Sequence, residues 1–189
     1  MREYNFNIVV GGKKITTDDS LGDIADALYE AGCGDGDPEV CNGTLYVNFT
    51  RHSESYAKAV QSAIANIESV AGLRCLSVDM SEIISLSDAA ERTGLTTSAL
   101  SRYYKGSRGA GNFPTPIFRV DSNRPLWAWT DIAEWLAQHD LIDDELVEQA
   151  RITDAINTAL SIRNNNSMDT VFQCLYALKF NHNRTAIAL

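Results

Sequence analysis

The chain has 189 residues, of which 44% are hydrophobic and 22% are charged, the composition of a globular protein long enough for one or two small domains. No stretch approaches the roughly 20 apolar residues that cross a bilayer, and the N-terminus lacks the apolar core of a signal peptide, so we expect a cytoplasmic protein with no membrane span. The four cysteines are scattered without a C-x-x-C pair, which favours reduced thiols over disulfides. The net charge of −9 argues at first sight against nucleic acid as a partner.

The charge is distributed unevenly along the chain. Residues 1–80 carry 6 lysines and arginines against 12 acidic residues, residues 81–138 carry 6 against 6, and residues 139–189 carry 4 against 7. Within the middle region, the stretch 98–126 holds five basic residues and one acidic residue. Contact with phosphates needs such a local positive stripe, because counterion release depends on nearby charge rather than on the total. The middle region is therefore compatible with DNA binding inside an acidic protein.

Residues 1–80 predict a domain with the element order β-α-β-β-α-β. Tyr4, Phe6 and Ile8 alternate with polar residues, as in a half-buried strand. The later elements are a helix that Asp18, Asp19 or Ser20 can cap and Gly32 can stop, a hairpin of residues 37–41 and 44–50 around Asn42-Gly43, a helix from about Ser53 to Gly72, and a strand over 73–78. This order predicts a ferredoxin-like domain that folds on its own. The fold hosts many functions and identifies none.

Residues 81–138 contain two short helices joined through a glycine. Ser87 is placed to cap the first helix, which ends at Gly94, and the run 96–98 offers a cap for the second. This arrangement is typical of a helix-turn-helix, whose second helix presents its N-terminal residues to base edges in the major groove. One of Tyr103 and Tyr104 is expected to pack inside while the other reaches a phosphate.

A predicted wing follows the second helix. The basic loop 105–111 leads to a strand over 117–120, a turn over 121–125 and a return strand over 126–129, after which Thr130 can cap a helix. The tip of this wing can enter the minor groove or hold a phosphate. The candidate DNA contacts of the two helices, the loop and the wing are Thr97, Ser98, Ser101, Arg102, Tyr104, Lys105, Arg108, Arg119 and Arg124.

The stretch LSDAAERTGLTTSALSRYYKGSRG, followed by FPTPIFRVDSNRPLWAWTDIAEWL, resembles the winged helix-turn-helix of the MerR, excisionase and AlpA-like DNA-binding proteins. The resemblance covers about 53 residues, from Ile84 to Leu136. It implies sequence-specific binding of duplex DNA, commonly as a dimer on an inverted repeat. The effector domains and the long dimerisation helix of MerR regulators match nothing in this chain, so the resemblance implies no effector.

Other patterns in the chain predict no further chemistry. The three histidines, His52, His139 and His182, are far apart in sequence and lack ligands at metal spacing. The run 35–39 lacks the spacing of a calcium loop, and the run 11–14 predicts a hairpin turn rather than a phosphate-binding loop. No catalytic triad or carboxylate pair is present, so we expect neither a metal, nor a cofactor, nor enzyme activity. The three tryptophans, Trp127, Trp129 and Trp135, are expected in the core.

Residues 139–189 predict a helical tail for dimerisation or partner binding. Ile152, Ile156 and Ala159 are spaced as one helix face, and the run 164–166 interrupts the pattern. Ser167 can cap a final helix. Its apolar stripe consists of Met168, Val171, Phe172 and Leu175. Such a short helix has to bury this stripe, so we expect a homodimer.

The sequence thus predicts an α+β protein with a ferredoxin-like domain (1–80), a winged helix-turn-helix (81–138) and C-terminal helices (139–189). The function we expect is that of a sequence-specific regulator of transcription that binds double-stranded DNA, as a repressor or autoregulator. Two alternatives remain open: an antitoxin or adaptor that binds a partner protein through its acidic N-terminal domain, and an excisionase-like DNA architecture factor. A basic partner encoded beside this chain would favour the first alternative, and an adjacent integrase the second.

Overall fold

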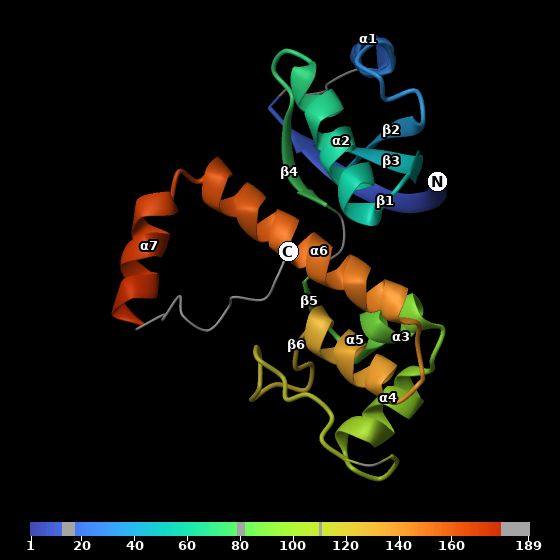
Figure 1. The fold of residues 1–189 in the computed structure, drawn as a ribbon, viewed down its shortest axis with the longest axis vertical. Coiled ribbons are helices and arrows are strands. Elements are labelled where there is room, and N and C mark those ends of the chain that lie inside the picture. Colours follow the sequence, from blue (N-terminus) through green and yellow to red (C-terminus); the bar gives the residue numbers. More distant parts are fainter. Residues whose placement is uncertain (13–17, 79–81, 110, 179–189) are drawn as a thin grey trace.

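The computed structural model describes residues 1–12, 18–78, 82–109 and 111–178, and these form a mixed α+β fold with seven helices (Figure 1). The strands are β1 (Arg2–Gly11), β2 (Gly36–Cys41), β3 (Thr44–Ser53), β4 (Arg74–Val78), β5 (Ile83–Ile84) and β6 (Trp127–Ala128). The helices are α1 (Asp18–Glu30), α2 (Tyr56–Ser69), α3 (Leu86–Thr93), α4 (Thr97–Tyr104), α5 (Trp129–Gln138), α6 (Asp144–Asn164) and α7 (Met168–Ala177). No helix among the described residues is long and apolar enough to cross a membrane. The predicted turn at Lys13 and Lys14, His182 and the end of the predicted tail lie outside the described residues.

The larger sheet has four antiparallel strands in the order β2-β3-β1-β4. Asn42 and Gly43 join β2 to β3 with φ angles of 51° and 77°, the left-handed pair that a two-residue hairpin turn requires. Alternate residues of β1, among them Phe6 and Ile8, are buried against Leu28 of α1 and side chains of α2. The first half of the chain therefore supplies most of one hydrophobic core, on one face of this sheet.

A buried arginine ties the hairpin to the loop before it. Arg51 is only 7% exposed, and its Nε and Nη2 atoms donate to the two carboxylate oxygens of Asp35 at 2.7 Å each. Nη1 donates to Ser62 of α2 at 2.9 Å. The hydrogen bond from Arg51 lowers the pKa of Asp35 below its ordinary value. This network links β3, α2 and the loop directly before β2.

A second core lies between the short sheet and the helices α3, α4 and α5. The three tryptophans are buried in it, as predicted, and the indole nitrogens of Trp127 and Trp135 donate to backbone carbonyls in the loop before the wing. The predicted strand 126–129 is wrong at its end, because α5 already begins at Trp129. Ala128 occupies the N-cap position with no side-chain cap, so Thr130 lies inside the helix and does not cap it. The strand β6 runs directly into α5.

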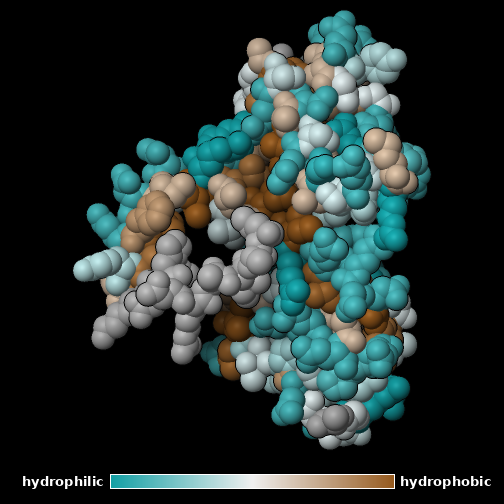
Figure 2. Space-filling view, in the orientation of Figure 1, coloured by the Kyte–Doolittle hydropathy of each residue, from teal (hydrophilic) through white to brown (hydrophobic). Residues whose placement is uncertain are grey.

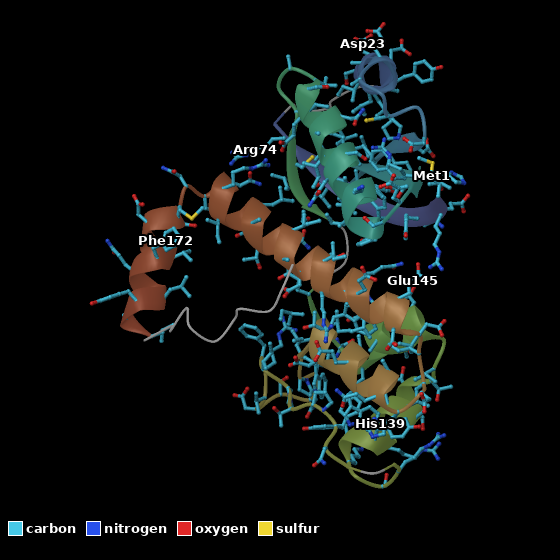
Figure 3. The ribbon with its side chains drawn as sticks, viewed as in Figure 1. Met1, Asp23, Arg74, His139, Glu145 and Phe172 are labelled. Atoms are coloured by element: carbon cyan, nitrogen blue, oxygen red, sulfur yellow. The ribbon has the colours of Figure 1, made fainter. Side chains whose placement is uncertain are left out.

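Helix α6 joins the two cores (Figures 1 and 3). Val147 and Ala150, near its start, are buried in the second core, and Leu160, near its end, is buried in the first. Figure 3 shows Glu145 at one end of this helix and Arg74 of β4 beside the other. The expected apolar face is wrong at Ala159, which is exposed, because the neighbouring Leu160 takes the inward position. Helix α6 thus belongs to both cores.

Two asparagines of α6 occupy the outer edge of β4. Asn157 accepts from the N–H of Val78 at 2.7 Å and donates to its carbonyl at 3.0 Å, and Asn164 donates to the carbonyl of Cys75 at 2.9 Å. The spacing matches, because three strand residues span about 10 Å and seven helix residues span about 10.5 Å. These side chains therefore pair with the strand much as a neighbouring strand would.

Helix α7 has no buried residue in the isolated chain. Met168 is 51% exposed and Phe172 62% exposed, and Val171 and Leu175 are only half-buried. Figure 2 shows this helix as an apolar patch at the left of the molecule. The predicted cap is wrong: Ser167 makes no capping hydrogen bond, because its backbone is not in the extended conformation of an N-cap. The helix therefore leaves its predicted stripe without a partner within the described residues.

Candidate nucleic-acid interface

The first helix of the candidate interface, α3, begins two residues earlier than predicted. Ser85, not Ser87, is its N-cap: the Ser85 hydroxyl accepts from the N–H of Asp88 at 3.3 Å, and the Asp88 carboxylate accepts from the N–H of Ser85 at 2.8 Å. This reciprocal capping box leaves Ser87 exposed in the first turn. The hydrogen bond from the Ser85 backbone holds the pKa of Asp88 below its ordinary value. Gly94 ends the helix in the left-handed conformation, with φ 69°.

Replacement of Ser85 by Ala is expected to destabilise the winged region by about 1 kcal/mol, since this is the usual cost of losing a serine N-cap. The free energy of unfolding from urea titration measures the effect. Ser87→Ala is the matched control, two residues away, and is expected to change stability by less than about 0.5 kcal/mol, as exposed positions do. Equal losses in both variants would show that the cap assignment is wrong.

Helix α4 follows after a three-residue turn, residues 94–96. Thr96 caps it by accepting from the N–H of Ala99 at 3.1 Å, within the run predicted to supply the cap. The inner face of the helix buries Ala99, Leu100 and Tyr103. The outer face carries the polar residues singled out from the sequence: Thr97, Ser98, Arg102 and Lys105 are exposed, and Ser101 is half-buried. Because its inner face packs into the second core, α4 presents its polar face outward.

The predicted wing is shorter and more irregular than expected. A single bridge pairs Phe118 with Leu126, so the predicted strand 117–120 is wrong as a regular strand. Arg119 has a φ of 50°, in the left-handed region, and its carbonyl accepts from both the N–H and the hydroxyl of Ser122. This turn ends the strand pairing directly after Phe118, because left-handed backbone does not continue a strand.

A groove of about 590 Å³ separates α4 from the tip of the wing. The first turn of α3, the outer side of α4 and the wing tip at Asn123, Arg124 and Pro125 all contribute to its lining. Its lining residues are Ser85, Leu86, Ser87, Thr97, Ser101, Tyr104, Lys105, Asn123, Arg124, Pro125 and Trp127. The structure thus brings together five of the nine predicted site residues, on elements that are distant in sequence.

The other four predicted residues lie outside this groove. Ser98 and Arg102 form the next row of α4, one turn apart, with the Arg102 guanidinium 3.4 Å from the Ser98 hydroxyl. Arg108 stacks over the Tyr103 ring at 5.0 Å, in the loop after α4. Arg119 is exposed on the wing. All four are on the surface of the winged region, but only Ser98 and Arg102 share the helix with groove residues.

Of the two tyrosines of α4, one is buried and the other is exposed, as the sequence predicts. Tyr103 is 6% exposed and packs on Trp135, while Tyr104 is 40% exposed. The Tyr104 ring meets Trp127 edge-on at 5.1 Å, which fixes it at the groove wall. Whether its hydroxyl reaches a phosphate stays a prediction.

Sequence reasoning missed three polar groove residues, Ser85, Ser87 and Asn123. The sequence offers both Ser85 and Ser87 as N-caps, and the Asp three residues after Ser85 is the signal that identifies Ser85 as the cap. Asn123 had only a place in a predicted turn. Its position opposite α4 depends on the fold of the wing, which local patterns do not specify.

The groove differs in charge from other depressions on the described surface. Its lining contains Lys105 and Arg124 and no carboxylate. In three other depressions, all of which include residues of α6 or of the loop before it, the acidic side chains outnumber a single arginine: Asp140 and Asp143 against Arg92; Glu54, Asp144, Glu145 and Glu148 against Arg2; and Glu134, Asp144 and Glu148 against Arg151. The groove between α4 and the wing therefore attracts an anionic ligand more strongly than these three depressions do.

Among the residues that the structure describes, no group of three or more histidine, cysteine, aspartate and glutamate side chains is arranged to hold a metal ion. The polar lining of the groove consists of hydroxyls, one amide and two cations. These groups can donate hydrogen bonds to an anionic polymer such as a phosphodiester backbone. Comparison of the chain with family models, with curated proteins and with solved structures gives no match.

Proposed function

We propose that this chain is a cytoplasmic regulator of transcription that binds specific sequences in double-stranded DNA and performs no enzymatic reaction. In this proposal residues 1–80 form a ferredoxin-like domain, and residues 81–138 form a winged helix-turn-helix with α4 as the recognition helix. The observation that carries the proposal is the groove between α4 and the wing, with its hydroxyl donors, two cations and no carboxylate.

The lining of the groove fits one phosphodiester strand of DNA. Phosphate oxygens accept hydrogen bonds from Lys and Arg, from Ser, Thr, Asn and Tyr, and from helix N-termini. The groove offers each of these: the first turn of α3, the Thr97 and Ser101 hydroxyls, and the cations Lys105 at the end of α4 and Arg124 on the wing. A strand held there separates the major groove, on the side of α4, from the minor groove, on the side of the wing. The outer row of α4, Ser98 and Arg102, then faces base edges.

Selection of bound sites from random duplex DNA, followed by mobility-shift titration of the selected site, tests this proposal. We expect one preferred sequence, bound about 10³-fold or more tightly than unrelated DNA, as specific binders are. Binding should weaken steeply with salt, because the groove cations displace counterions. The absence of any enriched sequence, with equal weak binding to all duplexes, would refute sequence-specific regulation.

The second candidate is a protein-binding role for the N-terminal domain, as in an antitoxin or adaptor, and helix α1 favours it. Asp23, Asp26 and Glu30 are exposed on this helix beside Tyr29, which is 73% exposed. Figure 3 shows Asp23 at the far end of the molecule from the winged region. A basic partner could bind this face while the groove holds DNA, so both roles are compatible. Tyr29→Ala with Asp26→Asn should then reduce partner binding and leave DNA binding unchanged.

We propose a homodimer as the DNA-binding form, because no residue of the apolar stripe of α7 is buried by the described part of the chain. Multi-angle light scattering is expected to give twice the mass of one chain at micromolar concentration. Phe172→Asp should shift the protein to a monomer, since it places a charge in the centre of the stripe. The matched control is Asp169→Asn, one turn earlier on α7. A parent protein that is monomeric both free and on DNA would disprove the dimer.

A further inference from the structure

The wing exposes three apolar side chains that no described element covers. Ile117 is 47% exposed, Phe118 54% and Val120 66%. They are nearly consecutive, whereas exposed apolar residues on a monomer are normally scattered. Arg119 lies between them, and Arg124 lies across the turn at the wing tip. An apolar patch flanked by cations fits a partner that has an apolar interior and a negatively charged rim.

The backbone of the wing holds this patch outward. The N–H groups of Ile117 and Phe118 both donate to the carbonyl oxygen of Leu126, at 2.8 and 3.2 Å. Two residues facing one is the pattern of a β-bulge, which bends a strand and redirects its side chains. The left-handed turn at Arg119 follows at once. The strand alternation that would bury every second side chain is therefore interrupted where the apolar residues occur.

The wing contributes Asn123, Arg124 and Pro125 to the lining of the groove, and α4 contributes to the same lining. Ile117, Phe118 and Val120 do not line the groove, so the apolar patch belongs to the part of the wing outside it. If the groove holds a phosphodiester strand, as the proposed function requires, the wing lies over the minor groove beyond that strand. Apolar side chains that enter the minor groove insert between adjacent base pairs and partly unstack them.

We infer that Phe118 is a wedge that enters a base step of the minor groove, with Ile117 and Val120 against the sugars and Arg119 and Arg124 on the flanking phosphates. The inference rests on the proposed function. It adds a source of sequence preference that no hydrogen bond supplies, because pyrimidine–purine steps unstack more readily than other steps. The selected site is therefore expected to carry such a step beside the bases that α4 contacts.

Fluorescence of 2-aminopurine, placed in turn at each position of the selected site, tests the wedge in the full-length protein. The base is quenched when stacked, so the parent is expected to raise its fluorescence at one step on the wing side. Phe118→Ala is expected to lose this rise and the preference for a pyrimidine–purine step, while Phe118→Leu keeps part of both. The matched control is Tyr29→Ala, which removes an exposed aromatic ring of α1 and should leave the rise intact.

Melting temperatures establish that the variants fold, and Val120→Ala provides a second variant with a smaller expected loss. A parent that binds its selected site without any rise in fluorescence, or a Phe118→Ala variant with an undiminished rise, overturns the wedge and leaves the proposed function standing. A parent that selects no site overturns both. A Phe118→Ala variant with a lower mass in light scattering assigns the patch to a protein interface, and this also overturns the wedge.

Discussion

Replacement of Arg102 by Ala is expected to weaken binding to the selected site by about 1–3 kcal/mol and to relax the preference at one base position. Arg102 is exposed on the outer row of α4, one turn from Ser98, where its guanidinium can form two hydrogen bonds to a guanine. Mobility-shift titration against the selected site and its single-base variants measures both effects. Unchanged affinity would show that α4 does not read the sequence, and the protein-binding role would then lead.

Arg124→Ala is the control for this experiment, because Arg124 lines the same groove from the wing and not from α4. It is expected to weaken all sequences similarly and to reduce the salt slope by about 0.9, the contribution of one phosphate contact. The double variant Lys105→Ala with Arg124→Ala should reduce the slope by about 1.8. All three side chains are exposed, so melting temperatures should be nearly unchanged.

A fragment ending at Asp79 is expected to be mostly unfolded, although residues 1–80 have the element order of a complete domain. The fragment lacks α6, which buries Leu160 in the first core, and Thr153, which shares a buried hydrogen bond with Tyr56 at 2.9 Å. It also lacks the paired hydrogen bonds from Arg163 to Glu68. Loss of one buried leucine costs about 2–5 kcal/mol, and a domain has only about 5–15 kcal/mol of stability in total. Circular dichroism and amide NMR dispersion measure the outcome.

Leu160→Ala in the full chain removes the most buried apolar side chain that α6 contributes to the first core. It should lower the free energy of unfolding by about 2–5 kcal/mol. Thr158→Ala, at an exposed position of the same helix, is the matched control and should change stability by less than about 0.5 kcal/mol. Adding a peptide of residues 144–164 to the fragment is expected to restore folding. A fragment that melts at the temperature of the full chain would show that α6 contributes nothing to the first core.

Local patterns predicted much of the fold. The Asn42-Gly43 hairpin follows from the left-handed backbone that these two residues tolerate, and Gly94 ends α3 for the same reason. The role of α6 could not be predicted, because it packs on two cores with different faces. Ala150 faces one core and Leu160 the other, so its apolar residues do not form one stripe. Sequence patterns therefore indicate that this segment is helical but do not indicate which elements it packs against.

The site was predicted on α4 more fully than on the wing. Helical periodicity separates the inner Leu100 and Tyr103 from the outer polar face, and the structure has the same division. On the wing, the run Ile117–Val120 has strong strand propensity, but one short bridge with no second layer cannot bury it. Strand propensity reflects packing against neighbouring strands, and the wing has only one partner segment. The groove itself depends on tertiary placement.

The hydrogen bonds that Asn157 and Asn164 of α6 make with the edge strand β4 also affect solubility. An uncovered sheet edge is a template on which further chains can add as strands, and this leads to aggregation. Asn157 and Asn164 occupy that template along β4, while Pro38 and the exposed Asp37 and Glu39 make the opposite edge, β2, a poor acceptor. Detachment of α6 would therefore expose the unpaired edge of β4 as well as part of the first core. Substitutions that loosen this helix should favour self-association through β4 over simple unfolding. The two asparagines therefore protect the protein from strand-mediated aggregation.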